Sequence, residues 1–171
     1  MTSALRQRPL LAAGLAVVAL TLAATAGSLS ADFVAWDDGI TIYANPNLGD
    51  LSLDRLAWAL TDTATTMRWI PLTLLSLVIT HTIHGLDPFG YHLANWLLHG
   101  ASSLAALLVL RELLGRAAAR RGGGRDDAWV LVSAAAGALA WSLHPLRVEV
   151  EAWSNSRGHA QAGLLALLAL L

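Results

Sequence analysis

The chain contains no cysteine among its 171 residues. This absence excludes disulfide bonds, thiolate metal sites and cysteine nucleophiles, and it leaves the redox compartment open. Lysine is also absent, so all 11 basic residues are arginine. Charged residues make up only 13% of the chain, whereas a soluble domain carries about 25%. With 56% apolar residues the composition indicates a membrane protein, and a net charge of −1 gives no argument for nucleic-acid binding.

Four long apolar stretches and the beginning of a fifth run through the sequence. A membrane-spanning helix needs about 20 apolar residues. We therefore predict spans over residues 9–29, 91–114 and 128–144, and a further span over 160–171 that is cut short. Because the sequence stops inside this last apolar run, we expect an N-terminal fragment whose C-terminal remainder is missing. The predicted fold is all-α, a polytopic bundle of transmembrane helices with additional helices on the outer membrane surface.

The second apolar stretch, residues 69–84, decides the predicted topology. If it crossed the membrane, the five arginines between residues 111 and 125 would lie outside, against the positive-inside rule. If it lies on the outer surface, seven arginines and three acidic residues lie inside, while four arginines and nine acidic residues lie outside. We therefore predict an outer loop over residues 30–90 with surface helices at 52–60 and 69–84, the first of them N-capped by Ser52.

The N-terminus has a second interpretation, because Arg6 and Arg8, an apolar run and the sequence Ala24-Thr25-Ala26 are typical of a secretory signal with a cleavage site. The run is longer than the roughly 7–15 residues usual in such signals, which favours a retained helix. Whether this helix is cleaved stays open.

Two adjacent carboxylates, Asp37 and Asp38, follow the first predicted span. Neighbouring carboxylates repel each other, so we expect the pKa of one of them to be raised unless a cation lies nearby. Such a pair suits a catalytic general base, and Asp38 is a candidate ligand for a divalent cation. The alternative is a solvated acidic loop without chemistry.

A second polar cluster lies at the start of the predicted span over 91–114. His92, Asn95 and His99 follow one another at intervals of three and four residues, which places them on one face of a helix. Polar side chains within a span can bind substrate, and two histidines can bind a metal. They also serve as interhelical hydrogen-bonding groups, and the sequence leaves these alternatives open.

A third polar cluster joins the span over 128–144 to the following one. Its candidate substrate-binding residues are His144, Arg147, Glu149 and Arg157. The guanidinium group of Arg147 or Arg157 suits a phosphate, although pairing with the neighbouring glutamates is an equal alternative. Pro145 should end the preceding helix.

Five stretches, in this order, resemble the membrane O-mannosyltransferase-like proteins that carry tetratricopeptide repeats, a family of the GT-C glycosyltransferase class. The matching residues are Phe33-Val-x-Trp-Asp-Asp38, Asn45-Pro46, Ile70-Pro71-Leu72-Thr73, Gly90-Tyr91-His92-Leu93-x-Asn95-x-Leu97-Leu98-His99, and His144-Pro145-Leu146-Arg147-Val148-Glu149 followed by Trp153 and Arg157. The resemblance covers about residues 30 to 160, most of the chain.

The resemblance implies an integral membrane enzyme that takes a sugar, expected to be mannose, from a polyprenyl-phosphate-linked donor and transfers it to a protein or envelope acceptor. In that class the first outer loop holds the acidic catalytic motif, matched here by Asp37 and Asp38. The expected location is a bacterial inner membrane with the active site on the periplasmic face. A divalent cation is a candidate cofactor, and we expect the fragment alone to be inactive.

Two alternatives to this enzyme remain from the sequence. One is a non-catalytic membrane protein of the same fold that serves as a platform for a repeat domain. The other is a transporter whose histidines and asparagine line a pathway. A transporter predicts ionisable groups near the middle of the spans, whereas here they gather toward the predicted outer ends of the helices, which favours an enzyme at the membrane surface.

Overall fold

The structure, a computed structural model, describes residues 3–65, 67–120 and 127–171. This described part contains helices and loops and no β-strand. The long helices are α1 (Ser3–Thr25), α4 (Pro88–Arg120) and α5 (Asp127–Ser142), and α1 continues into the 3-10 helix η1 (Ala26–Ser30). The shorter ones are α2 (Leu53–Thr61), α3 (Pro71–His84), α6 (Val148–Ala152) and α7 (Arg157–Leu168). The prediction of an all-α fold is confirmed.

Among the described residues, two helical segments are long and apolar enough to cross a membrane, Arg8–Ser30 and Pro88–Arg120. A third crossing is added if α5 and the following Pro145–Ala152, which bend by 59° at the break between them, form one span. At 1.5 Å per residue α4 is about 50 Å long, longer than the roughly 30 Å of a hydrocarbon core. These lengths, with the apolar composition, make the chain part of an all-α membrane bundle.

Helix α4 extends beyond the predicted span over 91–114 at both ends. Pro88 begins it, because proline is pre-organised for the first helical turn and has no N–H to leave unpaired. Toward Arg120 the sequence is rich in alanine and arginine, both strong helix formers. Hydropathy therefore marked only the apolar part of a longer helix. Residues 121–126, which include two of the five arginines used in the charge count, lie outside the described residues.

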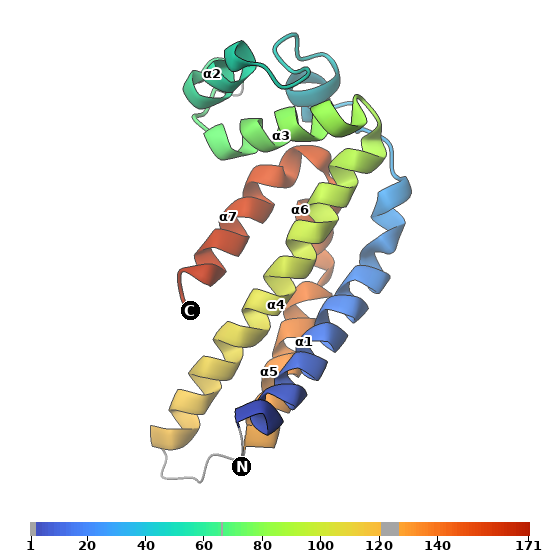
Figure 1. The fold of residues 1–171 in the computed structure, drawn as a ribbon. Helices are drawn as coiled ribbons and strands as arrows, with labels where there is room; N and C mark the ends of the chain where they lie inside the picture. The colour runs from blue at the N-terminus through green and yellow to red at the C-terminus, as the bar shows by residue number, and fades with distance from the viewer. Residues whose placement is uncertain (1–2, 66, 121–126) are drawn as a thin grey trace.

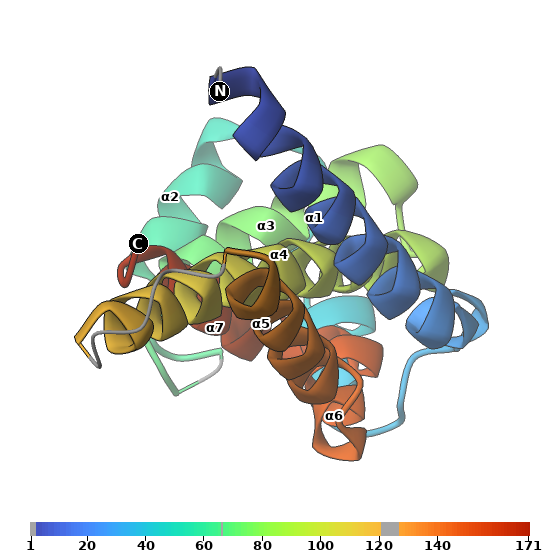
Figure 2. The same ribbon diagram turned by 90° about the horizontal axis from the view of Figure 1, so that it is seen from below.

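Helix α4 is the centre of the fold, since every other α-helix except α2 packs against it. Figure 2 shows it running through the middle of the molecule with the other helices around it. A core of small and branched residues fills the contact between α1, α4 and α5: Val17, Ala106, Leu107, Ala134 and Ala138. Small side chains let membrane helices approach closely. Inside this contact a buried hydrogen bond of 2.8 Å joins the Thr21 and Ser142 hydroxyls.

Residues 31–87, here called the cap, close the end of the bundle opposite to the N-terminus (Figure 1). Helix α3 runs across this end rather than along the bundle, and α2 lies beyond it. Ser52 caps α2 by accepting a hydrogen bond from the Arg55 N–H at 3.3 Å, which confirms the predicted N-cap. Helix α3 begins at Pro71 and ends before Gly85, whose φ of 60° suits glycine.

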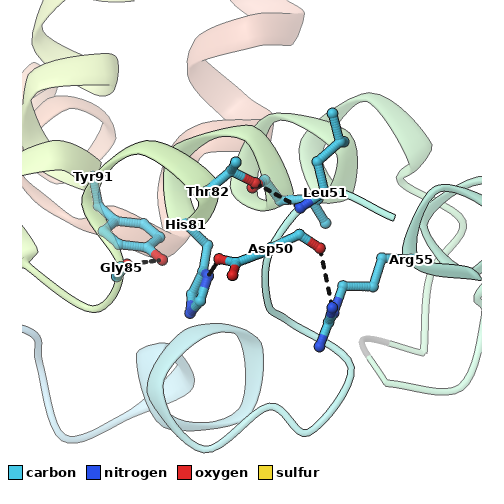
Figure 3. Close-up of polar contacts among 8 residues, drawn as sticks. Asp50, Leu51, Arg55, His81, Thr82, Gly85 and Tyr91 are labelled. Atoms are coloured by element: carbon cyan, nitrogen blue, oxygen red, sulfur yellow. Dashed lines mark hydrogen bonds and ion pairs between the residues drawn. The ribbon is translucent and has the colours of Figure 1, made fainter. Parts of the chain in front are cut away.

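The loop that precedes α2 is fixed to α3 by polar contacts (Figure 3). The Leu51 N–H donates to the Thr82 hydroxyl at 2.9 Å, and the Asp50 carboxylate lies 3.5 Å from Nδ1 of His81. Arg55 donates from Nη1 to the Asp50 carbonyl at 3.0 Å. The buried apolar residues Ile42, Leu48, Ala59, Leu74, Leu77 and Val78 of the cap form one core together with Tyr91 of α4. The cap is therefore packed onto α4 as a folded unit.

Candidate functional site

The two adjacent aspartates have different surroundings. Asp38 has no exposed surface, and its two carboxylate oxygens accept backbone hydrogen bonds from different segments. Oδ2 accepts from the Val34 N–H at 2.9 Å, and Oδ1 accepts from the Asn155 N–H at 3.0 Å. Asp38 therefore joins the start of the cap to the turn before α7.

The pKa of Asp38 is raised above its ordinary value of 3.8, as expected for one member of the pair. The cause differs from the expected one, however. Burial away from water raises this pKa most, and the two backbone N–H groups and the nearby His92 imidazole lower it by smaller amounts. Repulsion from Asp37 is not among its causes.

Asp37 is half-buried and faces a pocket of about 520 Å³. Its Oδ2 lies 3.5 Å from the Nδ2 donor of Asn155, at the outer limit of a hydrogen bond. The pocket is bounded by the loop before α3, the first turn of α3 and the first half of α7. Its polar lining residues are Asp37, Thr41, Thr65, Arg68, Thr73, Asn155, His159 and Gln161, and its larger apolar ones are Ile40, Met67, Ile70, Leu72 and Leu165. One opening thus combines a carboxylate, a guanidinium group and an apolar wall.

The cluster on the first half of α4 is buried and directed at neighbouring segments, as the shared helical face predicts. Nε2 of His99 lies 3.0 Å from the Ser142 carbonyl, and Nε2 of His92 lies 3.4 Å from the Ser154 hydroxyl. Asn95 donates from Nδ2 to the Trp153 carbonyl at 2.9 Å. Of the three roles that the sequence left open for this cluster, substrate binding, metal binding and hydrogen bonding between segments, these contacts correspond to the third. None of the three residues lines the pocket.

Arg157 is only 1% exposed. Its Nε donates to Oδ1 of Asn95 at 2.7 Å, Nη1 donates to the Thr80 hydroxyl at 2.9 Å, and Nη2 donates to the Tyr91 carbonyl at 2.8 Å. All three guanidinium nitrogens are therefore engaged with oxygens of α3 and α4. A phosphate could reach Arg157 only if these bonds broke, so this arrangement favours a role inside the protein over the predicted contact with substrate.

The rest of the third polar cluster lies away from the pocket. His144 is exposed, and its Nδ1 accepts from the Leu146 N–H at 3.3 Å, which caps the 3-10 turn Pro145–Arg147. The guanidinium of Arg147 stacks over the Trp141 ring at 4.8 Å, and Glu149 is exposed. Helix α5 ends at Ser142, just before Pro145, as predicted. The structure therefore brings Asp37 and Asp38 together with the segment 153–157, but leaves His144, Arg147 and Glu149 apart from them.

Sequence reasoning missed the cation of the pocket. Arg68 lies in the loop before α3, directly ahead of the stretch Ile70-Pro71-Leu72-Thr73 that supported the family resemblance. Gln161 was missed as well, and Thr73 was named only as part of that stretch; the two residues join α3 to α7 by a side-chain hydrogen bond of 3.0 Å. Only the neighbourhood of that stretch could have drawn attention to Arg68, because a loop has no periodicity that reveals where its side chains lie.

The residues around Asp38 do not form a metal-binding set. Within the described part of the chain, no group of three histidine, aspartate or glutamate side chains is close enough together to hold a metal ion. Both Asp38 oxygens are already hydrogen-bonded to backbone N–H groups. The described residues around Asp38 therefore do not supply a complete set of protein ligands for the predicted cation.

Similarity to other proteins extends over most of the chain. The chain is 32% identical to "Protein O-mannosyl-transferase TMTC2" of Mus musculus over 164 residues. The matched region covers 90% of this chain and 17% of the mouse protein. The protein of the same name from Homo sapiens has the same identity and coverage. "Protein O-mannosyl-transferase Tmtc1" of Drosophila melanogaster is 34% identical over 151 residues, covering 84% of this chain and 16% of that protein. The predicted family resemblance is confirmed. No protein-family model and no solved structure matches the chain.

Proposed function

We propose that this relative of the TMTC protein O-mannosyl-transferases forms part of a membrane glycosyltransferase of the GT-C class. The proposed reaction transfers a sugar, mannose by the names of its relatives, from a polyprenyl-phosphate donor to a hydroxyl group of a protein or envelope acceptor. The proposed location is the outer face of a membrane, a bacterial inner membrane being our expectation. Because the chain covers 17% of the mouse relative, we propose this activity for the whole protein and not for this part of it alone.

One observation carries this proposal. Asp37 and Arg68 line the same pocket, and the rest of that pocket is largely apolar. An acceptor hydroxyl must lose its proton as it attacks the anomeric carbon, and a carboxylate at the site can take that proton. The bond from the sugar to the phosphate then breaks, and the leaving phosphate needs positive charge, which a guanidinium fork supplies. An apolar wall suits the first isoprene units of the lipid.

In this proposal the two aspartates have separate tasks. Asp37 faces the pocket and acts as the base. Asp38 is buried and holds the loop that carries Asp37, through its bonds to Val34 and Asn155. If a divalent cation assists, the donor's phosphate oxygens would have to supply part of its coordination, because the described residues offer no complete set.

The direct test of this function uses membranes that contain the full-length protein. They are supplied with radiolabelled polyprenyl-phosphate mannose, and incorporation into protein is compared with membranes that lack the protein. The proposal predicts transfer that depends on the protein. Transfer from a nucleotide-linked mannose but not from the lipid-linked one would overturn the donor assignment, and no transfer from any mannose donor would favour a non-catalytic platform.

Replacement of Arg68 by alanine should weaken donor binding. The variant removes the guanidinium of the pocket, so we expect the KM for the lipid-linked donor to rise at least tenfold or so, the effect of one charge-assisted contact of about 1.5–3 kcal/mol. The matched control is Arg116→Ala. Arg116 is exposed near the C-terminal end of α4, where it pairs with Glu112, and it does not line the pocket. An equal KM in both variants would remove Arg68 from the donor site.

The rate of transfer should fall in acid. Burial raises the pKa of Asp38, so this carboxyl is protonated at a pH at which an exposed aspartate is still charged. Protonation of Asp38 weakens its hold on the Val34 and Asn155 N–H groups and so on the loop that carries Asp37. The rate of transfer should therefore be highest above the raised pKa of Asp38 and decline as pH falls through it. Stability has the opposite sign: the folded state favours the protonated carboxyl, so its contribution is largest below 3.8 and decreases as pH rises through the folded pKa. Rates of transfer measured from about pH 4 to pH 8 test this, and a rate that rises toward acid would contradict it.

A further inference from the structure

Asn95, on the central helix α4, contacts both ends of the turn between α6 and α7. Asn95 on α4 donates from Nδ2 to the Trp153 carbonyl at 2.9 Å, at the start of the turn. Its Oδ1 accepts from Nε of Arg157 at 2.7 Å, at the end of the turn. These two contacts fix the orientation of the amide, because a carbonyl can only accept and a guanidinium can only donate. One side chain on the central helix thus holds both ends of a five-residue segment.

Arg157 extends this attachment to two further positions. Nη1 donates to the Thr80 hydroxyl on α3, and Nη2 donates to the Tyr91 carbonyl on α4, at 2.9 and 2.8 Å. Asn95, Thr80 and Arg157 are all buried. Within the described residues no carboxylate forms a salt bridge with Arg157, so neutral oxygens satisfy its charge. A buried cation held in this way loses its partners if it moves, which makes its position sharply defined.

The same turn carries the residue that binds the aspartates. The Asn155 N–H, two residues before Arg157, donates to Oδ1 of Asp38 at 3.0 Å. The Asn155 side chain lies 3.5 Å from Oδ2 of Asp37 and itself lines the pocket. The position of Asn155 therefore depends on Asn95 and Arg157, and the placement of both carboxylates depends on Asn155.

We propose that Asn95 and Arg157 are positioning residues for sugar transfer: they fix the turn 153–157 so that Asn155 holds Asp38 and directs Asp37 into the pocket. This inference rests on the proposed function. In this proposal Asn95 and Arg157 do not contact the donor themselves. They act on the reaction through Asn155. The proposal predicts that their loss impairs turnover more than donor binding.

The test compares Arg157→Lys and Asn95→Asp with wild type in the full-length protein. Lysine keeps the charge but not the fork, and aspartate keeps the acceptor for Arg157 but removes the donor to the Trp153 carbonyl. The matched control is Ser103→Ala, a buried polar residue of α4 whose hydroxyl bonds within its own helix, to the Gly100 carbonyl. We expect kcat to fall at least tenfold in both variants, the KM for polyprenyl-phosphate mannose to stay within twofold or so of wild type, and Ser103→Ala to resemble wild type.

The pH profile separates positioning from general loss of structure. The Asn155 N–H lowers the pKa of Asp38, so its loss raises that pKa, and the acid limb of the rate profile should move to higher pH in both variants. His92 on α4 is the titratable group whose charge acts on the pKa of Asp38, and neither variant replaces it. An unchanged limb together with a lower kcat, or a raised donor KM with kcat preserved, would overturn the proposal.

Amide hydrogen exchange supplies a measurement that needs no activity. In wild type the Asn155 N–H is bonded to a buried carboxylate, so peptides that cover residues 153–157 should exchange slowly. Exchange there should become at least tenfold faster in Arg157→Lys and Asn95→Asp but not in Ser103→Ala. Unchanged exchange would overturn the positioning role. If exchange accelerates while even wild type transfers no sugar, the attachment of the turn stands and the proposed function fails.

Discussion

Replacement of Asp37 by asparagine is expected to lower kcat for sugar transfer by about 100-fold to 10,000-fold, the usual contribution of a positioned general base. Asparagine has nearly the same size and can still meet the Asn155 side chain, but it cannot take a proton. Asp37 lines the pocket and is half-buried, so the change should leave the fold intact. The measurement is the initial rate of mannose transfer in membranes, at equal amounts of protein.

The matched control for this variant is Asp54→Asn. Asp54 is an exposed carboxylate of the same cap, in the first turn of α2, and it lies outside the pocket of Asp37. Asp38→Asn should also reduce transfer, since Asp38 accepts two backbone N–H groups and an amide can replace only part of that acceptor. Transfer that survives both Asp37→Asn and Asp38→Asn would make the acidic loop structural, which is the alternative left open by the sequence.

Replacement of Arg157 by methionine is expected to destabilise the protein by about 2–4 kcal/mol, a value typical of buried polar groups that lose a charged partner. Methionine fills similar space but donates no hydrogen bond. Oδ1 of Asn95 then lies buried without its donor, and the ties from α7 to α3 are weakened. The Tyr91 carbonyl lies within α4, where it can still accept a backbone N–H of the helix. Its loss of Arg157 should therefore add little to the free energy of destabilisation. Thermal unfolding of the full-length protein in detergent measures the change.

Arg147→Met is the matched control, because it removes the same type of side chain from a position that is only half-buried. Arg147 stacks over Trp141 at the surface, a contact of about 0.5–1 kcal/mol. The two variants should therefore differ clearly in melting temperature. Equal melting temperatures would show that the buried contacts of Arg157 contribute little to stability.

The start of α2 and the end of α5 follow closely from sequence patterns. Ser52 before a run with Asp54 in its first turn predicts the start of α2, and Pro145 predicts the end of α5 just before it. The spacing of His92, Asn95 and His99 predicts that they share a face. These features depend on neighbouring residues, so local rules are sufficient to find them.

The partners of these side chains depend on contacts between distant segments, which no local pattern encodes. Arg157 meets Asn95 and Thr80 across 62 and 77 residues of sequence. The family resemblance pointed to Arg157, but only the packing of α7 on α3 and α4 shows that its guanidinium is used inside the protein. Arg68 reaches the pocket from a loop that carries no pattern at all.

The different surroundings of the two adjacent aspartates could not be predicted from the sequence either. Asp37 and Asp38 are neighbours with identical side chains, and charge repulsion alone treats them alike. The backbone turn before Gly39–Tyr43 directs Asp38 inward to two N–H groups and leaves Asp37 at the pocket. Their different tasks thus follow from loop geometry that the sequence does not specify by itself.

Photo-cross-linking of the lipid donor tests the central claim, that the pocket beside Asp37 is the transfer site, most directly. A polyprenyl-phosphate mannose with a photoreactive group on its first isoprene unit is irradiated with membranes that contain the full-length protein. The account predicts labelled peptides that include the pocket's apolar residues Ile70, Leu72 or Leu165, and loss of label when unmodified donor competes. Label confined to other parts of the protein, with these peptides unlabelled, would contradict it.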